Sequence, residues 1–310
     1  MVTTTTTGGP IHRLSGALHR RPRLRLALLL GLPLLWLVVV YGGSLVALLS
    51  QSFFSLDTFS GTVDRTPTLE TWGNLFTDSN ISIAIRTTVM ATAVTIASAV
   101  IAFPIAYYAV RYAGRRMRAA FFVLILIPLW SSYLVRVYAW KLILAREGIL
   151  FWFVDKLHLN FALDAALSAP GIGGPSLSAS SLGQFLVFTY VWLPYMILPV
   201  HAALERVPRS YLEASADLGA RPFQTFRTVI WPLAIPGIAA GSIFTFSLTL
   251  GDYIIPTVIG DSSPFVGLAI YSYQGVAGNL PLAAAFTFFP IVIMGIYLYL
   301  ARRAGAFEAL

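Results

Sequence analysis

The sequence contains no cysteine, so disulfides, thiolate metal sites and cysteine nucleophiles are excluded. It is also poor in charge. Asp, Glu, Lys and Arg make up 11% of the 310 residues, against about 25% in an ordinary soluble domain. This composition excludes an ordinary water-soluble fold.

Residues typical of enzyme active sites are few and scattered. The four histidines, His12, His19, His158 and His201, form no H-E-x-x-H pattern, and there is no G-x-S-x-G sequence. Neither lysine follows a glycine, so a G-x-x-x-x-G-K-[ST] phosphate loop is absent. The chain is therefore predicted not to be an enzyme, to hold no metal or cofactor and to have no ATP-binding site of its own.

Apolar sequence is what the chain has in abundance: 57% of its residues are hydrophobic, and the mean hydropathy is +0.76. About 20 apolar residues in a helix cross the roughly 30 Å hydrocarbon core of a bilayer. Runs of this kind occur at 26–50, 82–110, 119–144, 182–204, 229–259 and 281–301. The expected fold is an all-α integral membrane protein with six transmembrane helices. Proline occurs in every run and bends helices, which favours a transporter or channel over a rigid anchor, although membrane helices are generally rich in proline.

Basic residues predict the orientation, because positively charged loops remain in the cytoplasm. Fifteen arginines lie in the N-terminal segment, in the connections between spans two and three and between spans four and five, and in the C-terminal tail. The opposite loops have only Arg65, Arg146 and Lys156. Both termini are therefore expected in the cytoplasm. This topology accounts for the net charge of +8, so a nucleic-acid partner has no remaining support.

The expected organisation has a basic cytoplasmic tail at 1–25, a six-span domain at 26–304 and a short cytoplasmic tail at 305–310. The first apolar run is longer than the roughly 7–15 residues of a signal-peptide core, so it is expected to be retained. Residues 160–181 are rich in Ser, Ala, Gly and Pro and are expected to form an irregular loop on the outside.

The connection between spans four and five, residues 208–228, is predicted to fold as two short helices joined by a tight turn. Ser210 followed by Glu213 fits a capping box at the start of the first helix. Gly219 lies two turns later, where a left-handed residue ends a helix, and Pro222 suits the first position of the next helix. The apolar side chains expected on one face of this second helix are Phe223, Phe226 and Ile230. The result is a helix-turn-helix elbow on the cytoplasmic face, with an interfacial amphipathic loop as the alternative.

The elbow also resembles a family signature. Glu213-Ala214-Ser215, then Gly219 and the run Val229-Ile-Trp-Pro232, is similar to the E-A-A-x3-G-x9-I-x-L-P signature of permease subunits of type I ABC importers. Ser215 stands for the second Ala, and Trp231 for the Leu. The resemblance implies that 208–228 is a coupling segment that docks into a cleft on a separate ATPase, which binds ATP and Mg²⁺. Gly219 would be its hinge, and Glu213 would lock the short helix.

Further resemblance covers most of residues 80–300. The stretches 128–140, 146–148 and 250–256 are similar to the spermidine/putrescine permease group. This implies a polyamine importer in the bacterial cytoplasmic membrane. The implied partners are a second permease in a heterodimer, two ATP-binding-cassette ATPases, an extracytoplasmic solute-binding protein and membrane lipid.

Five residues are candidates for the substrate pathway. A flexible polycation needs carboxylates and aromatic faces. Asp252 is the only acidic residue near the interior of a span, and Tyr253 is adjacent to it. The aromatic candidates on the other spans are Trp192, Tyr195 and Tyr133.

The sequence leaves alternatives open for these residues and for the substrate. Asp252 would be structural if it paired with one of the cations inside the spans, Arg86, Arg136 or Lys141. The aromatic residues could serve packing alone. Other small polar solutes, such as amino-acid-like compounds or phosphonates, are the next candidates. An ion-driven carrier or channel is a more distant one.

Overall fold

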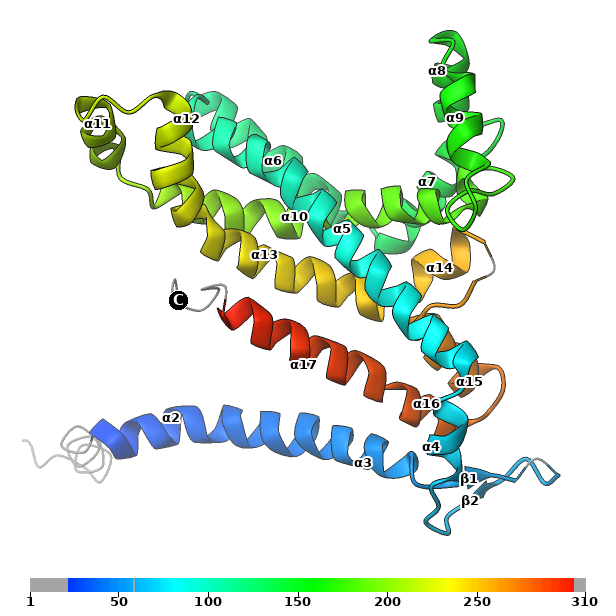
Figure 1. Cartoon of the computed structure of the whole chain (residues 1–310). Coiled ribbons are helices and arrows are strands. Elements are labelled where there is room, and N and C mark those ends of the chain that lie inside the picture. Colours follow the sequence, from blue (N-terminus) through cyan, green and yellow to red (C-terminus); the bar gives the residue numbers. More distant parts are fainter. Residues whose placement is uncertain (1–21, 58, 262, 304–310) are drawn as a thin grey trace, which may run out of the picture.

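The computed structural model describes residues 22–57, 59–261 and 263–303, so most of the expected tail at 1–25 and all of 305–310 lie outside the described residues. Five continuous helical spans are long and apolar enough to cross a membrane: Leu29–Gln51, Asp78–Arg111, Ser181–Glu205, Pro222–Gly251 and Leu280–Arg303. The remaining span is a pair of helices, Arg115–Trp130 and Tyr133–Ile143, bent by 96°. The prediction of an all-α fold with six spans is confirmed, with the third span broken (Figure 1).

Several spans contain more than one helical segment. The helices are α2 (Pro22–Trp36), η1 (Leu37–Gly42), α3 (Gly43–Gln51), α4 (Glu70–Leu75), α5 (Asp78–Arg111), α6 (Arg115–Trp130), α7 (Tyr133–Ile143), α8 (Ile149–Lys156), α9 (Asn160–Leu167), η2 (Leu177–Ala179), α10 (Ser181–Glu205), α11 (Arg209–Asp217), α12 (Pro222–Thr225), η3 (Phe226–Ile230), α13 (Trp231–Gly251), α14 (Ile254–Val258), α15 (Val266–Gly275), α16 (Leu280–Phe286) and α17 (Phe288–Arg303). A short antiparallel hairpin pairs β1 (Ser55–Leu56) with β2 (Val63–Asp64), in the register Ser55↔Asp64 and Leu56↔Val63.

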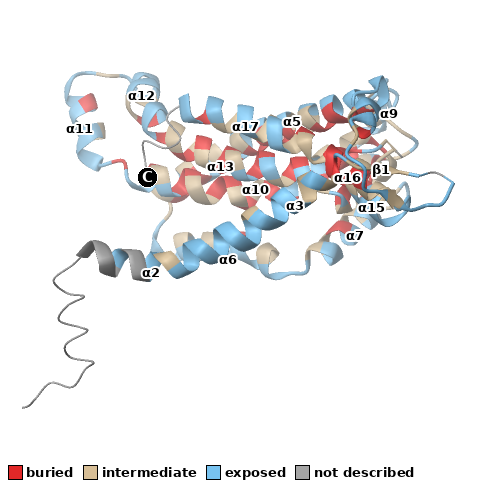
Figure 2. Cartoon of the chain, turned by 90° about the horizontal axis from the view of Figure 1, so that it is seen from below, coloured by how far each residue is buried: buried red, intermediate tan, exposed pale blue. Residues whose placement is uncertain are grey.

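Helices α5, α10 and α13 pack together as the centre of the molecule. The face that α5 turns inward is made of small side chains, among them Ala91, Ala102 and Ala106, each fully buried. On α13, Gly237 and Gly241 form a G-x-x-x-G pattern against α10. Small residues of this kind let membrane helices approach closely, so that packing contacts rather than bulky side chains hold them. Figure 2 shows the buried residues concentrated on α10 and α13, whereas α2, α3 and α6 are largely exposed.

Buried hydroxyl groups add polar links to this centre. Thr87 Oγ1 on α5 accepts from the Val266 backbone N–H (3.0 Å), which ties α5 to the start of α15. Thr95 and Thr245 lie within 3.5 Å of each other through their Oγ1 atoms, across the α5–α13 contact. Thr87 and Thr95 also donate to the carbonyl four residues earlier in their own helix. These buried polar groups are therefore satisfied within the bundle, as an apolar medium requires.

The fifth span differs from its prediction, because the run expected to be continuous over 229–259 breaks after Gly251. Pro256 has no N–H to donate to the carbonyl of Asp252, which weakens a helix at this point. The chain is extended at Asp252 (ψ 134°) and resumes as α14. In the third span, Ser131 is extended (ψ 150°), and its hydroxyl donates to the Pro128 carbonyl (2.8 Å) at the end of α6. Both breaks are therefore local consequences of polar residues beside a proline.

The prediction of an irregular loop over 160–181 is wrong in its first part, where α9 forms. Asn160–Leu167 has no glycine or proline and includes three alanines, so its local sequence favours a helix. The glycines and prolines lie beyond residue 168. Together α8 and α9 make a helical hairpin at the end of the molecule opposite to α11 and α12 (Figure 1).

The first span stands apart from the centre. None of the residues in its most apolar window is buried, and its main contact with the rest of the described chain is between α3 and α16. Its exposed side chains are nearly all Leu and Val. A helix with apolar residues on all sides suits an environment of acyl chains or of another membrane subunit.

We expect Gly237→Val to destabilise the bundle. A Cβ at this position would lie 2.4 Å from Ala203 Cβ and 2.7 Å from the Pro199 carbonyl oxygen, both on α10. Overpacking of this kind costs about 1–3 kcal/mol. The measurement is the thermal unfolding midpoint of the purified protein in detergent. Gly295→Val on α17 is the matched control, because its Cβ would have no atom within 4 Å. Equal midpoints for the two variants would contradict the close α10–α13 packing.

Candidate functional site

The elbow between the fourth and fifth spans consists of α11 and α12, at one end of the molecule (Figure 1). The first helix does not begin as predicted. Pro208 is the N-cap residue, with φ −64° and ψ 143°, so Arg209 and Ser210 already lie inside α11. No side chain caps this helix, and the Ser210–Glu213 capping box does not form. Glu213 is exposed, so it does not act through this capping box, and its expected lock on the short helix stays a prediction.

The turn of the elbow forms as predicted. Gly219 has φ 75°, a left-handed conformation that glycine adopts without strain. The Ala220 N–H donates to the Ser215 carbonyl (3.1 Å) and the Gly219 N–H to the Ala216 carbonyl (2.8 Å). This pair of bonds is a Schellman motif, which satisfies the last carbonyls of α11. Pro222 is the first residue of α12, as expected.

Ser215 links the two helices of the elbow. Its side chain is 9% exposed, and its hydroxyl lies 2.9 Å from Thr225 Oγ1 at the end of α12. Alanine at this position could not make the bond. The departure from the E-A-A pattern therefore adds a hydrogen bond between α11 and α12 and fixes their angle. Ala214, its neighbour, is exposed.

The second departure from the signature joins the elbow to the bundle. Trp231 begins α13, and its ring centroid lies 5.6 Å from that of Phe103 on α5 and 6.1 Å from that of Phe226. Pro232 follows it, after the π-helical turn η3. A proline leaves a carbonyl without its usual partner, and a local π turn is one way in which helices adjust to this. From the expected face, Ile230 is buried and Phe226 half-buried, whereas Phe223 is 72% exposed.

The outer surface of the elbow is shaped for contact. A cavity of about 380 Å³ lies between α11 and η3, lined among others by Tyr211, Ala214 and Leu218. A second, of about 280 Å³, lies between α11 and the end of α5 and includes Glu213, Arg209 and Arg111. The first hollow carries exposed apolar surface, since Leu218 is 88% and Tyr211 54% exposed, whereas charged side chains line the second. Exposed apolar groups at a hollow surface are typical of a docking site for another protein.

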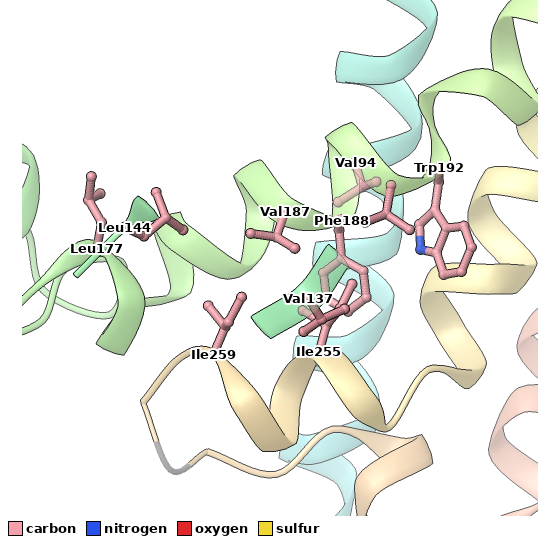
Figure 3. Packing of buried hydrophobic residues seen from close by; sticks show 10 residues of the cluster. Val94, Val137, Leu144, Leu177, Val187, Phe188, Trp192, Ile255 and Ile259 are labelled. Atoms are coloured by element: carbon pink, nitrogen blue, oxygen red, sulfur yellow. The ribbon is translucent and has the colours of Figure 1, made fainter. Parts of the chain in front are cut away.

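Deeper in the bundle, a hydrophobic cluster holds α7 and α14 against α10 (Figure 3). Val137 comes from α7 and Ile255 from α14, and both pack with Phe188 and Trp192 of α10. All but Trp192 are fully buried, and Trp192 is 8% exposed. The two broken spans are therefore fixed side by side, with the break in each at one edge of this cluster.

The predicted pathway residues meet at this edge, with one exception. The Tyr133 hydroxyl donates to the Asp252 carboxylate. The Tyr133 ring stacks on Trp192 (5.6 Å between centroids), and Trp192 contacts Tyr195 (5.8 Å). Tyr253 points elsewhere and stacks on Tyr271 (4.8 Å), beside a cavity of about 260 Å³.

Asp252 holds the break in the fifth span together. One carboxylate oxygen accepts from the Ile254 N–H (2.7 Å) and the Ile255 N–H (3.2 Å), the unpaired donors at the start of α14. The other accepts from Tyr133 at the start of α7. Within the described residues, Asp252 forms no ion pair with a cation. Its structural role is thus that of a cap that joins two breaks.

Arg136 is a part of this site that the sequence reasoning placed only as a possible partner of Asp252. Its guanidinium carbon lies 5.9 Å from the Tyr133 ring centroid. Its Nε and Nη1 atoms are buried and have no hydrogen-bond partner among the described residues. The spacing of three residues from Tyr133 in a helix was the signal for this contact.

Taken together, these features define a multi-pass helical membrane protein with a rigid elbow between two spans and polar breaks inside two others. Residues 102–305 match the family described as the binding-protein-dependent transport system inner membrane component. The chain belongs to this family and is an ABC importer permease.

Two relatives and one solved structure fit this assignment. The chain is 54% identical over 298 residues to the inner membrane ABC transporter permease protein YdcU of Escherichia coli K12, covering 96% of this chain and 95% of YdcU. It is 29% identical to the spermidine/putrescine transport system permease protein PotB of Haemophilus influenzae, covering 77% and 79% of the two chains. A crystal structure of a bacterial ABC transporter involved in the import of alginate has a chain with a TM-score of 0.65, covering 94% of this chain and 99% of that one at 16% identity. At that identity the likeness concerns the fold.

We expect Ser215→Ala to loosen the elbow. The variant loses the bond to Thr225, worth about 1 kcal/mol, so amide hydrogen exchange at Gly219 and Ala220 should rise several-fold. Exchange is measured by mass spectrometry on the purified protein. Ser210→Ala is the matched control, because Ser210 is exposed and caps nothing. An unchanged exchange rate in Ser215→Ala would show that the bond does not hold the turn.

Tyr133→Phe and Asp252→Leu should affect stability in a non-additive way. Each removes the Tyr133–Asp252 bond, and Asp252→Leu also uncaps α14. The double variant should therefore be less destabilised than the sum of the two single variants, with a coupling energy of about 0.5–3 kcal/mol. Thermal unfolding of the four proteins in detergent gives the cycle. Strict additivity would contradict a link between the two breaks.

Proposed function

We propose that this chain forms one half of the translocation pathway of an ATP-driven polyamine importer. It would lie in a bacterial cytoplasmic membrane with both termini and the elbow on the cytoplasmic side. The observation that carries the proposal is the elbow, in which the signature residues build a rigid, exposed docking surface before the fifth span. The start of α2 and the end of α17 lie at the same end of the bundle as this elbow (Figure 1), which agrees with the arginine distribution.

Coupling to ATP hydrolysis would be mechanical. Two separate ATPases would bind ATP and Mg²⁺, and one would dock on α11 around Tyr211 and Leu218, which are 54% and 88% exposed. The Ser215–Thr225 bond and the Schellman turn make α11 and α12 move as one piece. Phe226 and Trp231 transmit that motion to α5 and α13 by direct ring contact with Phe103. Closure of the ATPases would thereby tilt the central helices of the bundle.

The second permease would face the bundle from outside this chain. The first span exposes apolar side chains along its whole length and has few contacts with the bundle. Such a surface supports a heterodimer surrounded by lipid, since both lipid and a second helical subunit can cover it. An extracytoplasmic solute-binding protein would deliver the substrate to the end opposite to the elbow.

Polyamine recognition would depend on aromatic faces rather than on Asp252 alone. The Asp252 carboxylate already accepts three hydrogen bonds within the chain. The stacked rings of Tyr133, Trp192 and Tyr195 present faces that suit ammonium groups by cation–π attraction. Much of the selectivity would then lie in the binding protein.

Arg136 favours a second candidate substrate. A half-buried arginine whose buried Nε and Nη1 atoms have no partner among the described residues suits a carboxylate and repels a polycation. An amino-acid-like solute would satisfy it. The two candidates therefore differ in which residue binds: the aromatic rings for a polyamine, Arg136 for a carboxylate.

The test is purification of the tagged chain from its native membrane, identification of the subunits that accompany it, and transport by the complex in vesicles. The proposal expects an ATPase, a second permease and ATP-dependent uptake of labelled spermidine that Arg136→Gln leaves intact. Uptake of an amino acid instead, lost in Arg136→Gln, would favour the second candidate. A chain that purifies alone and transports without ATP would overturn the importer assignment of the elbow.

Two substitutions at Gly219 should show whether uptake depends on the left-handed backbone conformation of this residue or on the absence of a side chain. A Cβ at Gly219 would meet no atom within 4 Å, so only the positive φ opposes a side chain. Asn tolerates a left-handed conformation, whereas an ordinary side chain there costs about 1–2 kcal/mol and a β-branched one is more strained. We expect Gly219→Asn to retain ATP-dependent uptake and Gly219→Val to lose most of it while remaining in the membrane. Equal uptake by the two variants would contradict the role of the turn in coupling.

A further inference from the structure

The α8–α9 hairpin, residues 149–167, lies at the end of the bundle opposite to the elbow (Figure 1). It begins a few residues after the third span ends, and backbone bonds anchor the chain that follows it. The Ser178 N–H donates to the Leu144 carbonyl (3.2 Å), and the Gly260 N–H donates to the Ser178 carbonyl (2.9 Å). Both ends of the hairpin are thus held at the level where α7 ends and α10 begins.

The direction of α8 differs from that of the spans. In Figure 1, α10 and α13 run along the molecule, whereas α8 stands at one end of it and points away from their direction. Because the spans cross the bilayer, a helix at their ends that does not follow their direction lies along the bilayer surface. Its position at the ends of α7 and α10 places it at the membrane surface rather than in the hydrocarbon centre.

The hairpin has apolar residues on two faces. The inner face packs on the cluster around α10 through Leu150, Phe151, Leu163 and Leu167. The outer face is covered by nothing in the described chain, and its large apolar side chains are Ile149, Trp152, Phe153, Leu157, Leu159 and Phe161, all more than half exposed. Such a patch on a protein surface marks an interaction with a membrane or another protein.

The charges on and beside the outer face indicate whether it contacts a membrane or another protein. Lys156 lies on this face, with its Nζ 5.9 Å from the Trp152 ring centroid. The Asp155 carboxylate is bonded by Asn160 Nδ2 (2.8 Å) within the hairpin. Trp with an adjacent lysine, whose stem lies on apolar surface and whose ammonium reaches the headgroups, is the chemistry of the membrane interface. The other titratable side chains of the hairpin, His158 and Asp164, are also exposed, and headgroups or water can solvate them.

We propose that the α8–α9 hairpin is an interfacial lipid anchor. The side chains of Trp152, Phe153, Leu157 and Phe161 rest at the boundary between headgroups and acyl chains, in the leaflet opposite to the elbow. The anchor serves α7, the short half of the broken third span, which has only 11 residues and cannot cross the bilayer by itself. Held at the interface, α7 keeps Tyr133 against Asp252.

The chain has no cysteine, so a single introduced cysteine is its one labelling site, and the chain without it, purified with the same subunits, gives the background label. Phe153→Cys and Leu157→Cys, each modified with a nitroxide, are purified with their accompanying subunits and reconstituted in vesicles of phosphatidylethanolamine and phosphatidylglycerol. Paramagnetic relaxation by oxygen, which concentrates in lipid, is compared with relaxation by a water-soluble nickel chelate. Val89→Cys on the exposed face of α5 is the lipid control, and Thr66→Cys, in the exposed segment after β2, is the water control.

The proposal expects stronger relaxation by oxygen than by nickel at both hairpin positions, as at Val89→Cys and opposite to Thr66→Cys. Stronger relaxation by nickel at both positions would place the outer face in water and overturn it. Weak relaxation by both reagents would show that another subunit covers the face, and would overturn it in favour of a protein partner. Because no substrate or ATP is involved, these outcomes do not depend on what the importer carries.

Discussion

The structure depends on hydrogen bonds to the backbone N–H and C=O groups at the breaks in its spans, because such groups cannot stay unpaired in hydrocarbon. Two of its spans are interrupted, and each interruption leaves free donors at the start of a new helix. Asp252 accepts from two of these donors on α14 and from the Tyr133 hydroxyl at the start of α7. One carboxylate therefore serves both breaks. Without it, α14 would have unpaired N–H groups, and α7 would lose its side-chain hydrogen bond to the break in the fifth span.

The bundle around these breaks is stiff where small residues allow close approach. Gly237 and the alanines of α5 bring α5, α10 and α13 together, and these helices lead directly to the base of the elbow. A push on α11 therefore acts on a packed body rather than on a flexible loop. The breaks lie at the far end of that body, where α7 and α14 contact α10 through the cluster of Figure 3. Tilting of the central helices would reach the breaks through these contacts, since packed interfaces shift between discrete arrangements instead of deforming continuously.

Much of the fold could be predicted from the sequence because membrane spans are coded by composition. The six spans, the turn at Gly219 and the start of α12 at Pro222 all follow from local chemistry. The breaks were harder to foresee. Pro128 and Pro256 are visible as prolines, but most prolines in these spans, such as Pro194 and Pro199, lie in helices that continue. A helix ends at a proline where nearby polar side chains can bond the backbone groups that the break leaves unpaired. At the break in the fifth span this side chain is Asp252, and its own partner, Tyr133, is distant in sequence.

The errors have a similar origin. Ser210 and Glu213 have the spacing of a capping box, yet Pro208 sets the backbone two residues earlier and α11 starts before the serine. Residues 160–181 have the composition of a loop only when taken as one segment, and their first part has helix-forming residues. In both cases the pattern of residue types indicated what kind of local structure was possible, a capped helix or a loop. The backbone conformation of the neighbouring residues decided where the helix actually begins.

The two departures from the E-A-A signature carry a more general point about the elbow. Alanine at 215 and leucine at 231 would be apolar residues that fill space. Here, Ser215 bonds to Thr225, and Trp231 makes ring contacts with Phe103 and Phe226. Both replacements lie at joints, one between the two elbow helices and one between the elbow and the bundle, and both add an interaction with a defined geometry. Under the proposed coupling, motion passes from α11 to the bundle only as far as these two contacts resist bending. Ser215 and Trp231 would therefore support that role although they depart from the residue types of the signature.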